Sequence, residues 1–149
     1  MVTAELVRRV VDLFQLGLRF GGGWLPGQMC AEEVVCHALE PEVWNDYPPG
    51  VSPSVRTLLI GLNDTDWSTN RARADGLLAL TVAQLGTAGT IDETEFVERV
   101  IQVLTARLIP EMFKDVASVL DEPHKSQLLQ AADSCETESA LAVERVKKE

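Results

Sequence analysis

Most of this chain repeats its apolar residues with the spacing of an amphipathic α-helix. In the first such segment Leu6, Val10 and Phe14 share one side, while Arg8 and Asp12 fall on the other. The same pattern predicts helices over residues 3–18, 29–39, 52–63, 70–85, 92–108, 112–120 and 123–129. No segment alternates convincingly as a half-buried strand does. The pattern therefore predicts an all-α fold, an irregular bundle of roughly six to eight helices with a loop-rich, Pro/Trp-containing centre.

Particular residues mark where these helices begin and end. Thr3 and Ser52 are suited to the N-cap position, and Pro53 stands at a first helical position, where a missing N–H costs nothing. Gly86 stands where a glycine after the fourth helix can satisfy the last carbonyl groups. The three glycines at 21–23 interrupt the helical pattern. We interpret them as a flexible hinge rather than a phosphate-binding loop.

The composition is that of a globular protein. Of 149 residues, 46% are hydrophobic and 24% are charged. This length suits a single domain over residues 1–149, and such a domain buries enough surface to be stable without a cofactor. Residues 136–149 have helical propensity but a thin apolar face, so we expect a loosely packed or partner-binding tail.

The charge of the chain narrows the class of partner. With 23 acidic and 13 basic residues, its net charge is −10. A nucleic-acid-binding protein usually presents a basic patch, and the sequence has no basic cluster of that kind. We therefore expect no direct nucleic-acid binding. The acidic excess favours a basic protein partner, such as one that itself handles nucleic acid.

Cysteine usage and hydropathy indicate a cytoplasmic protein. The three cysteines include no CxxC pair, which suits a reducing compartment better than a disulfide framework. The first segment is amphipathic and lacks the continuous apolar core of a signal peptide. No apolar run approaches the ~20 residues that span a bilayer, so we expect no membrane contact.

Side chains that could act as nucleophiles or metal ligands are scattered along the chain. Cys36 and His37 are neighbours, but successive helical residues point about 100° apart and cannot form a catalytic dyad without a bend. Zinc needs four close Cys or His ligands, and no CxxC or HxxxH core is present. Asp64 and Asp66 begin a calcium-loop spacing, but Thr69 stands where that loop requires glycine. We therefore expect no metal site.

A series of short motifs resembles a known group of proteins. They are Cys30 at a helix start, Trp44-Asn45-Asp46-Tyr47-Pro48, Ser52-Pro53-Ser54-Val55, Leu62-Asn63-Asp64 and Leu85-Gly86-Thr87. Together they are similar to the pattern of short, uncharacterised bacterial and phage-encoded helical proteins. The resemblance implies an all-α fold and a link to mobile elements, but no activity. Many of those proteins carry a second cysteine where this chain has Gly50, so we carry over no role for a cysteine pair.

The turn before the third helix supplies the leading functional hypothesis. Its prolines fix the backbone, so its aromatic and acidic side chains are held in set directions. With residues from the following loop, they form a candidate partner-binding surface: Trp44, Asp46, Tyr47, Asp64, Asp66 and Trp67. Aromatic residues in such loops can also fill gaps between helices. We hypothesise a non-enzymatic protein-binding, inhibitor or accessory protein of a phage or other mobile element.

Two other hypotheses remain open. Asp46 and Asp64 stand beside opposite ends of the third helix, where they could converge and serve a small hydrolase-like enzyme by general acid–base catalysis. In the simpler interpretation each carboxylate only caps a turn or a helix. A homo-oligomeric structural protein would instead show a large apolar face on the last two helices.

Overall fold

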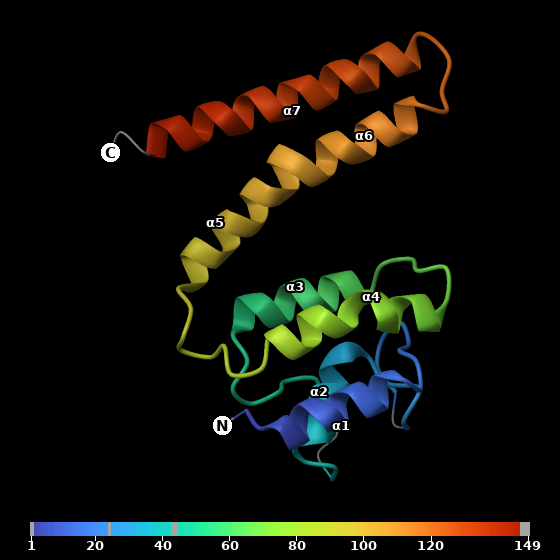
Figure 1. Cartoon of the computed structure of the whole chain (residues 1–149), viewed down its shortest axis with the longest axis vertical. Coiled ribbons are helices and arrows are strands. Elements are labelled where there is room, and N and C mark those ends of the chain that lie inside the picture. Colours follow the sequence, from blue (N-terminus) through green and yellow to red (C-terminus); the bar gives the residue numbers. More distant parts are fainter. Residues whose placement is uncertain (1, 24, 43–44, 147–149) are drawn as a thin grey trace. The chain divides into compact units, whose positions relative to one another are not determined.

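The structure, a computed structural model, describes residues 2–23, 25–42 and 45–146, with side chains as far as Ser139 (Figure 1). No strand occurs among these residues, so the all-α prediction is confirmed. The helices, in chain order, are α1 (Ala4–Phe14), α2 (Ala31–Leu39), α3 (Pro53–Asn63), α4 (Asn70–Ala83), α5 (Glu93–Val103), the π-helical turn η1 (Leu104–Leu108), α6 (Ile109–Ala117) and α7 (His124–Val146). Trp44 lies outside the described residues.

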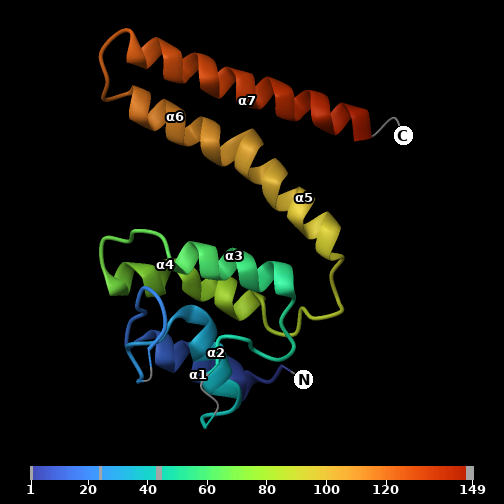
Figure 2. The same ribbon diagram turned by 180° about the vertical axis from the view of Figure 1, so that it is seen from behind.

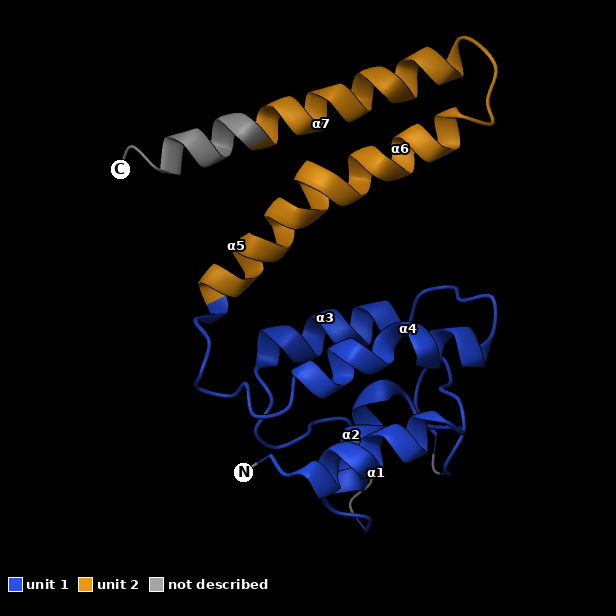
Figure 3. Cartoon of the chain, viewed as in Figure 1, with its two compact units in different colours: residues 1–93 blue, residues 94–149 orange. Residues whose placement is uncertain are grey.

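The chain divides into two compact units, residues 1–93 and residues 94–149 (Figure 3). We call them unit 1 and unit 2. Unit 1 contains α1 to α4, and unit 2 contains nearly all of α5 together with η1, α6 and α7. The interpretation of residues 1–149 as a single domain stays a prediction.

Most helix starts of unit 1 follow the local rules read from the sequence. The side chain of Thr3 accepts a hydrogen bond from Leu6 N, and that of Ser52 accepts one from Val55 N, as predicted. Cys30 caps α2 in a capping box with Glu33. The predicted end of the first helix at residue 18 is wrong, because Gly17 has a φ of +89° and α1 ends at Phe14.

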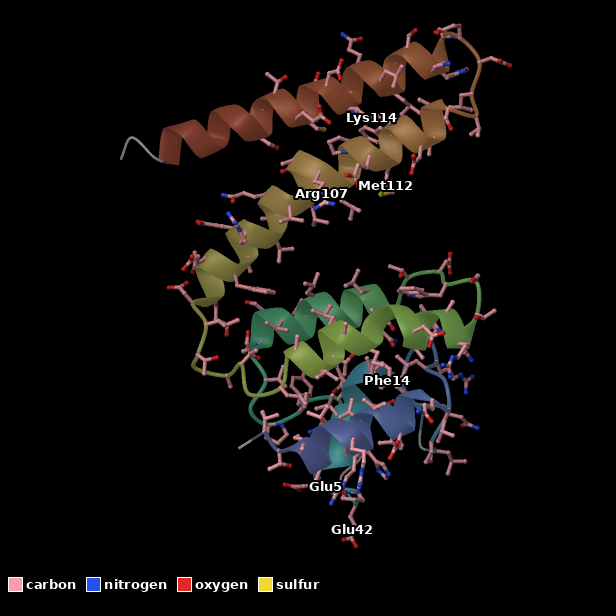
Figure 4. All side chains as sticks on the ribbon, in the orientation of Figure 1. Glu5, Phe14, Glu42, Arg107, Met112 and Lys114 are labelled. Carbon is pink, nitrogen blue, oxygen red and sulfur yellow. The ribbon has the colours of Figure 1, made fainter. Side chains whose placement is uncertain are left out.

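Helix α2 lies at the centre of unit 1. It contacts α1, α3 and α4, and both of its sides are buried. Figure 4 shows Phe14 of α1 directed toward the other helices of unit 1. The core consists mainly of small and aliphatic side chains from all four helices, among them Val10, Val34, Val35, Leu59 and Leu77. This packing fixes the N-terminal end of α2, where the candidate site lies.

Unit 2 is a helical hairpin. Helices α5, η1 and α6 follow one another without a break, and α7 packs antiparallel to α6 (Figure 2). The apolar pattern predicts separate helices over residues 92–108 and 112–120, on either side of Pro110, but helical structure continues past this proline. A proline ring clashes with the preceding turn of a regular α-helix and cannot donate its hydrogen bond. The wider turn of η1, directly before Pro110, accommodates both effects.

Helix α7 is longer than the sequence pattern predicts, because it continues beyond residue 129 to Val146. Within it, Glu136 accepts a hydrogen bond of 2.6 Å from Lys114 Nζ, and Ser139 donates one of 3.1 Å to Thr105. The start of the predicted tail, residues 136–139, therefore packs against η1 and α6. Its role in partner binding stays a prediction.

Candidate functional site

A pocket of about 300 Å³ lies in unit 1, at the N-terminal end of α2. Four carboxyl side chains line it: Glu32, Glu33, Asp46 and Asp64. Glycines 21–23 and Asn63 form further parts of its wall, and Ile60 adds an apolar surface. We call this site the carboxylate pocket. Asp46 and Asp64, the pair that the sequence suggested could converge, both line it.

Glu33 ties the glycine segment to α2. Its Oε2 accepts hydrogen bonds of 2.9 Å from both Cys30 N and Gly23 N. A Cβ atom at residue 22 would lie 2.5 Å from Glu33 Oε1, and one at residue 23 would clash with the carbonyl group of Gln28. The close approach to the backbone of Gln28 therefore requires glycine at residue 23, whereas at residue 22 the Glu33 side chain would have to move. The segment interpreted as a hinge is thus held by carboxylate contacts.

Asn63 and Asp64 hold the opposite wall of the pocket. Asn63 is buried; its Oδ1 accepts from Ala31 N at 3.2 Å and its Nδ2 donates to Arg19 O at 3.1 Å. Asp64 Oδ1 accepts from Gly21 N at 3.2 Å and from Asn63 Nδ2 at 2.9 Å. The end of α3 therefore positions both the start of α2 and the glycine segment.

Arg56 fixes the turn that brings Asp46 to the pocket. Its Nε donates to Asp46 O at 2.7 Å, and its Nη2 donates to Asp46 Oδ2 at 3.1 Å. The same guanidinium group lies 3.5 Å from the centroid of the Tyr47 ring. Tyr47 itself is exposed and does not line the pocket. Its ring and Asp46 are thus held by one half-buried cation.

Glu32 is the least expected member of the site, because it is fully buried. Gln84 Nε2 donates to its Oε2 at 3.3 Å, and its Oε1 has no hydrogen-bond partner among the described residues. Burial raises the pKa of Glu32 to about 8, although the bond from Gln84 and the charge of Arg56 lower it. Sequence reasoning missed this residue. The one available signal was a pair of acidic residues in the first turn after Cys30.

Two of the predicted partner-binding residues lie elsewhere. Asp66 is exposed in the loop between α3 and α4, away from the residues that line the pocket. Trp67 is half-buried; it packs against the core, and its Nε1 donates to Leu62 O at 2.9 Å. Trp44, predicted as part of the same surface, is outside the described residues. Asp46 and Asp64 share a site that does not include Asp66 or Trp67.

Two of the three thiols are buried, and the described acidic side chains form no metal-binding group. Burial raises the pKa of both Cys30 and Cys36 to about 12, so both thiols are protonated and unreactive near neutral pH. No group of three or more His, Cys, Asp or Glu side chains in the described part of the chain is arranged to hold a metal ion. None of the described helices is both long enough and apolar enough to cross a membrane.

Unit 2 carries a second notable surface, along α5, η1 and α6. Six large apolar side chains, each between 36% and 56% exposed, follow one another at intervals of three or four residues: Val97, Ile101, Leu104, Leu108, Met112 and Val116. We call this set the apolar stripe. Repeated four-residue steps drift around a regular α-helix, and the wider turn of η1 offsets that drift. Figure 4 shows Met112 and Lys114 on opposite sides of α6, with Lys114 facing α7.

Comparison with known proteins adds no family to this picture. No protein-family model, curated protein or solved structure matches the chain. The resemblance to short bacterial and phage-encoded proteins therefore stays a prediction. Function has to be inferred from the residues of the carboxylate pocket and of the apolar stripe.

Proposed function

We propose that this chain is a non-enzymatic protein-binding protein that engages a basic protein partner. The observation that carries the proposal is the apolar stripe of unit 2. A helical hairpin buries only the facing sides of its two arms, and the fully buried side chains described in unit 2 are small: Pro110, Ala117 and Ala132. Exposed apolar side chains that form a continuous row are typical of a surface that another protein covers.

The stripe has the form of a helix that binds in a groove. Its side chains recur at the spacing by which amphipathic helices anchor in apolar grooves of partner proteins. Arg99, Arg107 and Glu111 are exposed on the same helical arm and would form a polar rim. Large side chains such as Ile101 and Met112 would supply most of the binding free energy, because interface energy concentrates in a few well-packed residues.

The charge of the chain supports a basic partner. Unit 1 has 12 acidic and six basic residues, and the whole chain carries a net charge of −10. Such a field speeds association with a basic protein and disfavours nucleic acid. The proposal keeps the loop-rich centre of the sequence prediction as a second contact surface, in which Arg56 orients Asp46 and Tyr47. It also keeps the role of an accessory or inhibitor protein of a phage or other mobile element.

The experiment is an affinity capture that compares the wild-type protein with three variants. Tagged wild-type protein is compared with the double variant Ile101→Ser, Met112→Ser and with the matched control Leu16→Ser, Phe20→Ser. The two pairs have similar exposure, 53% and 56% against 58% and 59%, but only the first lies on the stripe. The fourth arm is the charge reversal Asp46→Lys, which tests the central turn.

We expect the wild-type protein and the control pair to retain one basic protein identified by mass spectrometry, and the stripe variant to lose it. Retention of that protein by the stripe variant would show that the stripe is not the contact surface. If no specific protein is captured and the wild-type protein sediments as a dimer that the stripe variant abolishes, the homo-oligomer hypothesis replaces this proposal.

One observation favours a second candidate, a small hydrolase-like enzyme. Asp46, Asp64 and Glu32 line one pocket, and a carboxyl group with a pKa of about 8 is suited to donate or accept a proton near neutral pH. The test is hydrolysis of a panel of ester, amide, glycoside and phosphate substrates by the wild-type protein and by Asp64→Asn. Activity that the variant loses while it remains folded would support the enzyme, and an inactive wild-type protein would count against it.

A further inference from the structure

The carboxylate pocket is built to receive positive charge. None of the described residues that line it is basic, and four of them carry carboxyl groups. Two arginines contact residues of the pocket wall, and both are already occupied: Arg56 by Asp46 and the Tyr47 ring, and Arg73 by backbone oxygens such as that of Asn63. Glu33 and Asp64 use one oxygen each to hold backbone N–H groups, which leaves acceptor capacity on both carboxylates. The polar groups around the pocket are therefore mainly acceptors.

A second and independent feature points to a ligand. Glu32 lines the pocket and is fully buried, yet its Oε1 has no hydrogen-bond partner among the described residues. Leaving a buried carboxyl oxygen unpaired is unfavourable, and more so when the group is charged. A donor that binds in the pocket would remove that cost, and a positively charged donor would remove most of it.

We propose that the carboxylate pocket binds a primary alkylammonium group, with Glu32 as its counter-ion and Asp46 and Asp64 as further acceptors. An ammonium group presents three N–H donors and no acceptor, which matches a set of carboxyl oxygens. A volume of about 300 Å³ exceeds what a single metal ion fills and leaves room for an alkyl chain beside Ile60 and the glycine backbone. The proposal concerns unit 1 and is independent of the apolar stripe.

Binding is coupled to the release of a proton. The free protein holds Glu32 as a neutral acid at pH 7, because its pKa is about 8. An alkylammonium ion, with a pKa near 10.4, arrives already charged and favours the ionised carboxylate. The Glu32 O–H bond breaks, its electron pair stays on the carboxylate, and the proton passes to solvent. Affinity should therefore rise with pH up to about 8 and then level off.

The charged and titratable groups around Glu32 set this pH dependence. On α2 and its N-cap they are Glu33, Cys30 and Cys36. Asp46 comes from the turn that precedes α3, and Arg56 comes from α3 itself. Helix α4 contributes the neutral Gln84, and α1 places Arg9 against Ala38 O, in the last turn of α2. Burial raises the pKa of both thiols to about 12, so neither thiol titrates in the range in which Glu32 does.

The test uses the full chain and n-butylammonium chloride as the probe, followed by the backbone amide NMR signals of residues 21–23. The same titration is made with n-butanol, with magnesium and calcium chloride, and with a short lysine-containing peptide. We expect the signals to shift with n-butylammonium and not with n-butanol or the metal salts. If the peptide binds more tightly than n-butylammonium, the natural source of the alkylammonium group is a lysine of a partner protein. If n-butylammonium binds more tightly, the source is a small molecule.

Two variants and one control make the assignment specific. Glu32→Gln should weaken n-butylammonium binding at least tenfold and abolish its pH dependence between about pH 6 and pH 8.5. Asp64→Asn keeps an acceptor for Gly21 N and should weaken binding three- to tenfold, whereas Asp66→Asn, outside the pocket, should leave it unchanged. No shift with any ammonium probe at pH 8.5, equal shifts with n-butanol, or shifts with metal salts alone would overturn the proposal. Capture results for the apolar stripe would be unaffected.

Discussion

Gln84 Nε2 donates a hydrogen bond of 3.3 Å to Glu32 Oε2, and neither side chain is exposed to solvent. The bond joins the C-cap of α4 to the first turn of α2 across the core of unit 1. The other oxygen of each side chain, Oε1, has no partner among the described residues. Burial favours the neutral acid of Glu32 and outweighs the hydrogen bond from Gln84, which favours the ionised carboxylate.

The first prediction concerns the stability of Glu32→Gln as a function of pH. In the wild-type protein the pKa of Glu32 rises from 4.5 to about 8 on folding, so the folded state keeps a proton that the unfolded state releases. Glu32 therefore makes the free energy of unfolding fall by about 1.4 kcal/mol per pH unit between these two values. Glutamine has no proton to lose, so the free energy of unfolding of the variant should increase relative to that of the wild-type protein as pH rises.

The measurement is urea denaturation of both proteins between about pH 5 and pH 8.5. Glu40→Gln, an exposed substitution at the other end of α2, serves as the control and should follow the wild-type curve. A difference between wild-type and Glu32→Gln that stays constant over this range would mean that Glu32 is ionised throughout.

The second prediction concerns Asn63, whose side chain connects α3 to the start of α2. Asn63→Ala removes the acceptor of Ala31 N and the donor to Arg19 O, both in a buried setting. We expect a loss of about 2 kcal/mol in the free energy of unfolding, because buried polar groups are left unpaired. Hydrogen exchange at Ala31 N should also accelerate. Gln15→Ala, at an exposed site, should change stability by less than about 0.5 kcal/mol.

The third prediction separates two arginine–aspartate pairs. Arg56, 16% exposed, bonds both the backbone and the side chain of Asp46 and stacks on Tyr47. Arg71, 61% exposed, pairs with Asp75 and donates to Gln15 O, but it contacts no aromatic ring among the described residues and both bonds are at the surface. Lysine keeps the charge but loses the planar, forked geometry. Arg56→Lys should therefore lower stability by about 1 kcal/mol and speed exchange at Tyr47 N, and Arg71→Lys should do neither. Equal effects in the two variants would show that only charge matters.

Local features of the fold could be predicted from the sequence, and distant contacts could not. Thr3 and Ser52 cap their helices as predicted, because capping depends on residues three positions apart. The early end of α1 at Phe14 also has a local signal, Gly17 inside the apolar pattern, which the periodicity of the apolar residues does not take into account. The course of the helix past Pro110 depended on η1, which no sequence pattern marks.

The candidate site shows the same limit more sharply. Asp46 and Asp64 could be paired in advance, because both flank one short helix. Glu32 could not be found, because its burial depends on Gln84, 52 residues later in the chain. The loop position of Trp67 leaves both a partner surface and a gap between helices open, and its ring lies over Gly76, on the next helix. Residue type therefore indicated candidate groups, and only packing indicated where these groups gather.

The last prediction tests that packing of Trp67 with two glycines in helix interiors. A Cβ atom on Gly76 in α4 would lie 2.5 Å from two ring atoms of Trp67, whereas one on Gly61 in α3 would meet nothing within 4 Å. Replacing glycine by alanine in an exposed helix stabilises by about 0.5–1 kcal/mol when the new methyl group has room. Gly61→Ala should show this gain, and Gly76→Ala should instead lose about 1–3 kcal/mol with a change in tryptophan fluorescence, because the indole must move. Since both sites are helical glycines, their difference in urea denaturation isolates the contact with the ring. If both variants gain stability alike, the indole moves freely, and Trp67 would again be available as a partner anchor.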